Sequence, residues 1–125
     1  MSTPEYYKYD DGEIHFECFG ISRYYSGDWA QVIQYVFRWQ KKGGVEDLEK
    51  ALACAIDARD NGMMPTPITK NQIFCRTIDY KLYVLCNYNY SNARKVWEKF
   101  NASRDTTYEI IDALEEMIRD AKNVE

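Results

Sequence analysis

The spacing of hydrophobic and polar positions predicts helices over most of this chain. From Ser26 onward, apolar residues recur at three- and four-residue intervals, the spacing of one helix face; they are Trp29, Val32, Ile33, Val36 and Phe37. Ser26 is expected to cap this helix, and Asp28 lies in its first turn, where an acid is favoured. Gly43 and Gly44 follow and end the pattern, because glycine readily takes the left-handed conformation of a C-cap.

A second helical pattern runs from about Val45 to Asn61. Because the link between the two is short, the pair is expected to form an antiparallel helical hairpin. Pro65 and Pro67 then mark a connector.

The C-terminal half carries three further patterns. The segment from Ile73 to Leu82 favours a helix capped by Thr69, although "YKLYVL" alone also suits a strand. A helix through Phe100 is expected to begin at Ser91. The last helix is predicted from a capping box of Thr106 and Glu109.

The N-terminal region is less regular. Met1 to Asp11 is interpreted as an irregular arm, and the alternation in Gly12 to Gly20 predicts a short strand, although the same residues also fit the start of a helix. The sum is a mainly α, single domain over residues 1–125, with a helical hairpin (9–62), a C-terminal helical half (68–125) and one short β element near the N-terminus.

Composition narrows the function. The net charge of −4 argues against bulk binding to nucleic acid, and no apolar run approaches a membrane span. Four dispersed cysteines and one histidine predict no zinc site, and reduced thiols in a cytosol fit best. The N-terminus has no signal-peptide pattern. Eleven tyrosines are many for this length and are typical either of core edges or of an interaction surface.

The candidate chemistry gathers around the two glycines. Arg38 and Lys42 are four residues apart and share a helix face, on which two cations can hold a phosphate. Lys41 adjoins them, and the glycine N–H groups and the next helix N-terminus also favour an anion. Asp47 can hold a metal ion or orient Arg38, and Lys50 can reach the same anion. The alternative is a solvated turn whose charges match the helix dipoles.

Other candidates are weaker. Tyr35 and Trp39 flank Arg38 and can stack on a base, or they simply pack. Two acid pairs resemble magnesium ligands but are also expected by chance on solvated faces; they are Glu46 with Glu49 and Glu109 with Asp112. His15 has no neighbours that suggest catalysis. The chain has no P-loop.

The stretch from Tyr9 to Asn61 resembles a small bacteriophage domain family that includes a nucleotide kinase without a P-loop. That family carries an N-A-I-K-Y-x-x-R-x-x-x-K helix followed by E-D-L-x-K-A. The matching residues here are Tyr35, Arg38, Lys42, Glu46, Asp47, Leu48, Lys50 and Ala51. Gln31 and Gln34 stand where the family usually has Asn and Lys.

The resemblance implies a phage protein of the host cytoplasm that binds (deoxy)nucleotide phosphates, phosphorylates nucleoside monophosphates and forms homo-oligomers. Arg38, Lys41, Lys42 and Lys50 would hold phosphates, and Tyr35 or Trp39 would lie near the base. Asp47 would be the catalytic residue, binding Mg²⁺ or orienting Arg38. The alternative is a non-catalytic phage early protein that binds a host protein or sequesters a nucleotide signal. The sequence leaves open whether the protein is an enzyme.

Overall fold

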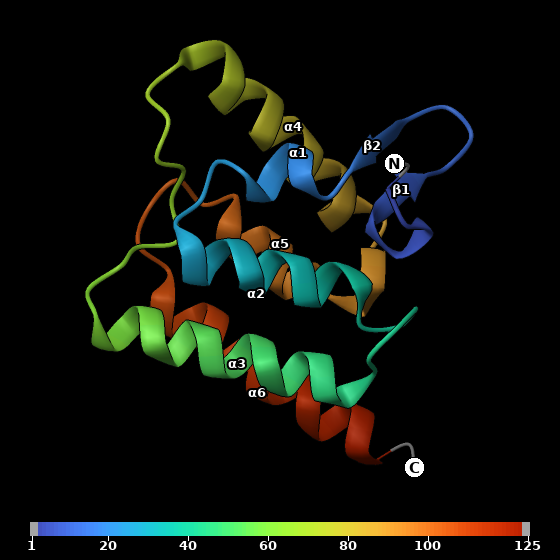
Figure 1. The fold of residues 1–125 in the computed structure, drawn as a ribbon, viewed down its shortest axis with the longest axis vertical. Coiled ribbons are helices and arrows are strands. Elements are labelled where there is room, and N and C mark those ends of the chain that lie inside the picture. The colour runs from blue at the N-terminus through green and yellow to red at the C-terminus, as the bar shows by residue number, and fades with distance from the viewer. Residues whose placement is uncertain (1–2, 124–125) are drawn as a thin grey trace.

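Two antiparallel helices form the centre of the fold, as the hairpin pattern predicted. They are α2 (Gly27–Arg38) and α3 (Val45–Asp60) in the computed structural model, which describes residues 3–123 (Figure 1). All five residues of the predicted α2 stripe are buried. On its other side, α3 packs against α6 (Thr107–Asn123). Seven shorter or peripheral elements complete the fold: η1 (Glu5–Tyr7), β1 (Lys8–Asp10), β2 (His15–Glu17), α1 (Phe19–Ser22), α4 (Gln72–Asn87), η2 (Tyr90–Asn92) and α5 (Arg94–Phe100).

The expected β element is present, but the arm before it is more regular than predicted. β1 and β2 pair antiparallel, with Tyr9 opposite Phe16. The ring of Tyr9 is buried between Phe16 and Tyr90, which gives the arm an apolar anchor. The irregular interpretation of this arm was therefore wrong for residues 5–10, and its first two residues lie outside the described range. Within Gly12 to Gly20, the strand prediction holds for residues 15–17, while Phe19 and Gly20 begin α1, in line with the helical alternative.

Two predicted caps in the C-terminal half are wrong. α4 is helical as favoured, but its cap is Asn71, whose Oδ1 accepts the N–H groups of Ile73 and Phe74. The Thr69 hydroxyl instead accepts the N–H of Asn71 itself. α5 begins at Arg94 and not at Ser91.

The capping box at α6 does not form either. The Thr106 hydroxyl donates to the carbonyl of Lys99, which ties α6 to the end of α5. The side chain of Glu109 binds Arg104, and Asp105 accepts the N–H of Thr107. The helix itself lies where the pattern predicted it, and only its cap differs from the prediction.

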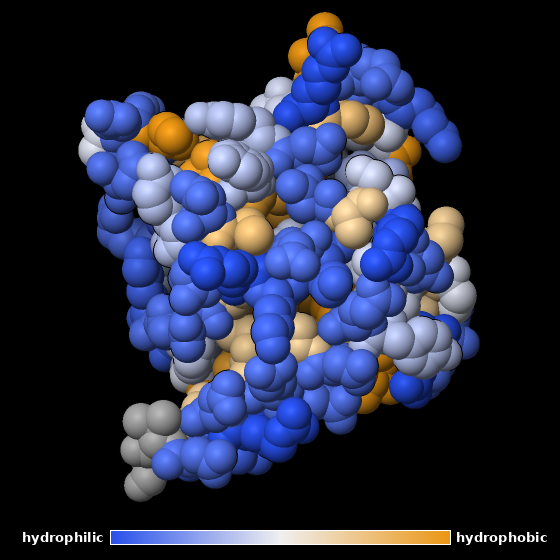
Figure 2. All heavy atoms as spheres, turned by 180° about the vertical axis from the view of Figure 1, so that it is seen from behind, coloured by the Kyte–Doolittle hydropathy of each residue, from blue (hydrophilic) through white to orange (hydrophobic). Residues whose placement is uncertain are grey.

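The surface seen from behind is mostly hydrophilic, with hydrophobic residues showing in separate places (Figure 2). Within residues 3–123, no helix combines the length and apolar character needed to cross a bilayer. Most of the charged candidate residues named from the sequence lie around the α2–α3 turn. The N-terminal arm, η2 and α6 approach the hairpin at this turn.

Candidate functional site

The Asp47 carboxylate occupies the centre of the α2–α3 turn. The guanidinium of Arg38 donates two hydrogen bonds to it, from Nε to Oδ2 and from Nη2 to Oδ1, both 3.1 Å long. The backbone N–H of Gly43 donates a third, 3.0 Å long, to Oδ2. Asp47 is only 1% exposed, so this is a buried, bidentate ion pair. The donors predicted to hold a phosphate thus hold a carboxylate of the same chain.

The N-terminal arm completes the surroundings of Arg38. The remaining guanidinium nitrogen of Arg38, Nη1, donates to the hydroxyl of Tyr7, 3.0 Å away. The rings of Tyr6, Tyr7 and Tyr35 lie within 5.1–5.9 Å of the guanidinium carbon, in the range of cation–π contacts. Partial burial alone would lower the pKa of Arg38, but the bond to Asp47 and the contact with Tyr7 outweigh it and raise the pKa. The arginine therefore joins the hairpin to the arm.

The two glycines have separate structural roles. A Cβ at Gly43 would overlap the Asp47 carboxylate, so the pair needs glycine there. Gly44 has φ of +60° and donates its N–H to the carbonyl of Trp39. α2 ends at Arg38, earlier than the pattern suggested, so Lys41 and Lys42 lie in the turn and not on the helix.

Each predicted phosphate-binding lysine contacts a neighbour. Lys42 Nζ donates to the hydroxyl of Tyr6 and lies 4.5 Å from the centre of that ring. Lys50 pairs with Glu46 at 3.7 Å. Lys41 donates to the hydroxyl of Tyr90. Lys41 and Lys42 are exposed and form no ion pair with a carboxylate among the described residues, so both remain open to a ligand.

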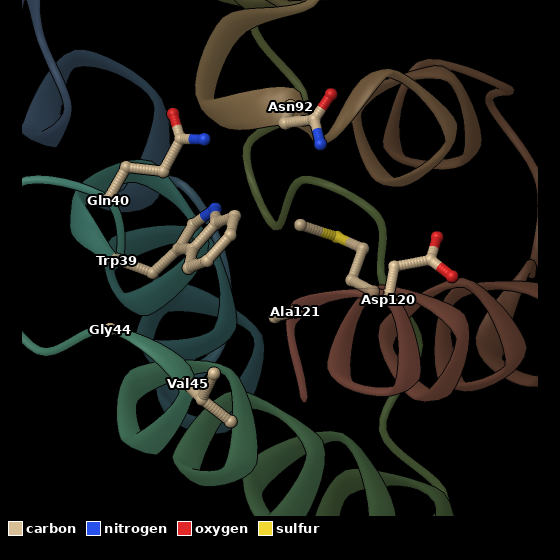
Figure 3. A pocket seen from close by; sticks show the side chains of 8 residues that line it. Trp39, Gln40, Gly44, Val45, Asn92, Asp120 and Ala121 are labelled. Carbon is tan, nitrogen blue, oxygen red and sulfur yellow. The ribbon is translucent and has the colours of Figure 1, made fainter. Parts of the chain in front are cut away.

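A pocket of about 460 Å³ lies beside this turn, as Figure 3 shows. The turn, η2 and the last turns of α6 enclose it; its lining residues are Trp39, Gln40, Gly44, Val45, Asn92, Met117, Asp120 and Ala121. The indole Nε1 of Trp39 donates to the carbonyl of Ser91, which fixes the ring in the wall. Of the candidate site residues named from the sequence, Trp39 and Gly44 line this pocket.

The η2 side of the pocket is conformationally unusual. Asn89, Ser91 and Asn92 all have positive φ, between 49° and 56°. Ser91 is held there by a buried bond from its hydroxyl to the carbonyl of Phe37. Positive φ at non-glycine residues is costly and gathers at functional sites. The signal in the sequence was the asparagine-rich "NYNYSN", since asparagine tolerates this conformation better than most residues other than glycine.

A second hollow, of about 240 Å³, adjoins the first and shares Asn92, Met117 and Asp120 with it. Its cations already have partners. Lys95 makes two 3.0 Å bonds to Glu116, and Arg94 donates to the carbonyls of Cys86 and Asn87. We call the two hollows together the Trp39 groove.

The acid pairs do not converge. Three of the four acids pair with cations, as Glu46–Lys50, Glu49–Lys122 and Glu109–Arg104. Within residues 3–123, no group of three or more His, Cys, Asp or Glu side chains is placed to hold a metal ion. His15 is exposed on β2. Both oxygens of Asp47 are engaged, which favours its orienting role toward Arg38. Mg²⁺ stays a prediction of the resemblance.

We predict that Asp47→Ala lowers the free energy of unfolding by about 3–5 kcal/mol, because it leaves Arg38 partly buried and unpaired. The double variant Arg38→Met with Asp47→Leu should lose less, since no lone charge remains. Urea unfolding measures both. Lys50→Ala breaks the exposed pair with Glu46 and should cost about 0–1 kcal/mol. An Asp47→Ala cost equal to that control would show that the pair is not structural.

A scan against protein-family models and searches of curated proteins and of solved structures find no match to this chain. The resemblance to the phage family therefore stays a prediction based on its residues, and the geometry of the site carries the functional argument.

Proposed function

We propose that this protein binds a nucleotide in the Trp39 groove and holds it without turnover. The observation that carries the proposal is the aromatic-walled pocket beside a cationic turn. Its volume of about 460 Å³ lies within the usual range for small-ligand sites, about 300–1,000 Å³.

The base would stack on Trp39. Base–aromatic stacking is tolerant of base identity and contributes about 1–3 kcal/mol. The bond from the indole to Ser91 holds the ring before a ligand arrives, so little ordering is needed on binding. Gln40 and Asn92 contribute amides to the lining, and such groups can donate to and accept from a base edge.

The phosphates would lie toward Lys41. Lys41 is not itself a lining residue, but it follows Gln40 in the chain, and its contact Tyr90 lies two residues before Asn92. Asp120 lines the α6 side and would repel phosphate there. Its carboxylate suits a sugar hydroxyl instead.

Binding without turnover fits the state of Asp47. The candidate catalytic carboxylate is buried and accepts three hydrogen bonds. Using it as a general base or metal ligand would require breaking the pair with Arg38. Together with the resemblance, this supports a phage protein that sequesters a nucleotide in its host.

We predict that nucleoside monophosphates change the tryptophan fluorescence saturably. Trp29 and Trp97 are fully buried, at 0% exposed, so the partly exposed Trp39 should report the ligand. Lys41→Met should weaken binding about ten-fold by removing one charged contact. Lys42→Met also removes one positive charge, at the neighbouring position, and should change the affinity for the nucleotide little. Equal losses of affinity in both variants, or no saturable fluorescence change in the wild type, would contradict nucleotide binding in the Trp39 groove.

The same protein incubated with dTMP or dGMP, a nucleoside triphosphate and magnesium should yield no diphosphate. Phosphoryl transfer depends on positioning and charge neutralisation, and the two central candidates, Arg38 and Asp47, are bound to each other. Diphosphate formed in proportion to protein concentration would overturn binding without turnover and favour the kinase hypothesis.

A second candidate function, docking of a host protein, is favoured by the outer face of α4. Ile73, Tyr80 and Tyr83 are 73%, 53% and 58% exposed on this helix. They lie seven and three residues apart and so share one side. α4 forms an edge of the fold in Figure 1. Tyrosine is enriched in protein interfaces relative to the rest of the surface.

The double variant Tyr80→Ser with Tyr83→Ser should lose a stoichiometric partner that the wild type captures from host lysate. Tyr108→Ser alters a tyrosine on α6 that is 67% exposed, and it should retain the partner. Capture of the same partner by all three proteins would remove α4 as the docking face.

A further inference from the structure

A small pocket between α1 and α4 gathers two cations that have no carboxylate partner among the residues that the structure describes. Its volume is about 230 Å³, and its lining residues are Gly20, Arg23, Tyr24, Phe74, Thr77 and Lys81. None of them belongs to the Trp39 groove or to the α2–α3 turn. Any ligand of this pocket therefore binds apart from the nucleotide site proposed above.

The two cations are unusual in this acidic protein, which has 20 acids against 16 Lys and Arg. Within residues 3–123, the ion pairs include neither Arg23 nor Lys81. Among the described residues, the side chain of Arg23 donates only through Nε, to the carbonyl of Phe19 at 2.7 Å. Partial burial and then the charge of Arg23 lower the pKa of Lys81. Two like charges thus face one pocket, an arrangement that an anion between them would relieve.

The walls of the pocket fit the cations. The ammonium of Lys81 lies close to the α1 backbone, because a Cβ at Gly20 would come within 2.6 Å of its Nζ. The rings of Tyr24 and Phe74 stack 5.4 Å apart and are partly or largely exposed. The pocket therefore offers two charged donors next to an aromatic surface.

We propose that this pocket binds the phosphate group of a small aromatic phosphate ester. Arg23 and Lys81 neutralise the phosphate: arginine as a planar fork and lysine as a point charge. Tyr24 and Phe74 pack against the aromatic group. A phosphate is favoured over a carboxylate because its two negative charges match the two cations.

Isothermal titration calorimetry with phenyl phosphate, in chloride buffer of fixed ionic strength, tests the proposal. The wild type should bind saturably and more tightly than it binds inorganic phosphate. Arg23→Gln should weaken binding about ten-fold. Arg76→Gln removes an exposed charge from α4 outside this pocket and serves as the matched control; its affinity should stay within about two-fold of wild type.

Gly20→Ala is the sharper variant because it changes no charge. Alanine is favoured over glycine within a helix by about 1 kcal/mol, and only the flexible end of Lys81 must move. The variant should be at least as stable as wild type and yet bind phenyl phosphate more weakly. Absence of saturable binding, unchanged affinity in both Arg23→Gln and Gly20→Ala, or equal affinity for inorganic phosphate would overturn the proposal. Lys41→Met should leave this binding unchanged, which separates it from the Trp39 groove.

Discussion

The buried carboxylate of Asp47 is the group on which the α2–α3 turn depends. It lies at the start of α3, and it receives the Arg38 fork from the end of α2 and the Gly43 N–H from the turn between them. The same arginine binds Tyr7, so the N-terminal arm is attached at this point too. A buried pair of this kind adds little net stability over an apolar replacement, but losing one partner is costly, and that asymmetry can hold a turn to one conformation.

The remaining geometry of the site follows from that turn. With Arg38 directed to Asp47, the next residues, Trp39 and Gln40, face η2 and α6 and form the wall of a pocket (Figure 3). The indole bond to Ser91 then ties η2 to the hairpin. In the proposed function, the ion pair would therefore act on ligand binding through positioning, while the ligand itself would contact Trp39 and Lys41.

Local patterns predicted the helices well, because apolar spacing records which face is buried. The α2 stripe and the antiparallel hairpin are both as expected. Caps were less predictable, since Ser91 and Thr106 use their hydroxyls on distant carbonyls that no local pattern reveals. The site shows the same limit. An arginine, a glycine and a helix N-terminus attract any anion, and the sequence cannot say whether that anion is a phosphate or the chain's own Asp47.

NMR can test directly whether the Arg38–Asp47 pair is structural while the ligand binds at Trp39. Side-chain N–H signals of Arg38 (Nε) and of the three tryptophan indoles (Nε1) should be followed in a ¹⁵N-labelled sample as a nucleoside monophosphate is added. We expect the Trp39 indole signal to shift saturably while the Arg38 signal and the buried Trp29 and Trp97 signals stay in place. A saturable shift of the Arg38 signal with an unchanged Trp39 signal would show that the phosphate displaces Asp47, and would contradict the structural role of the pair.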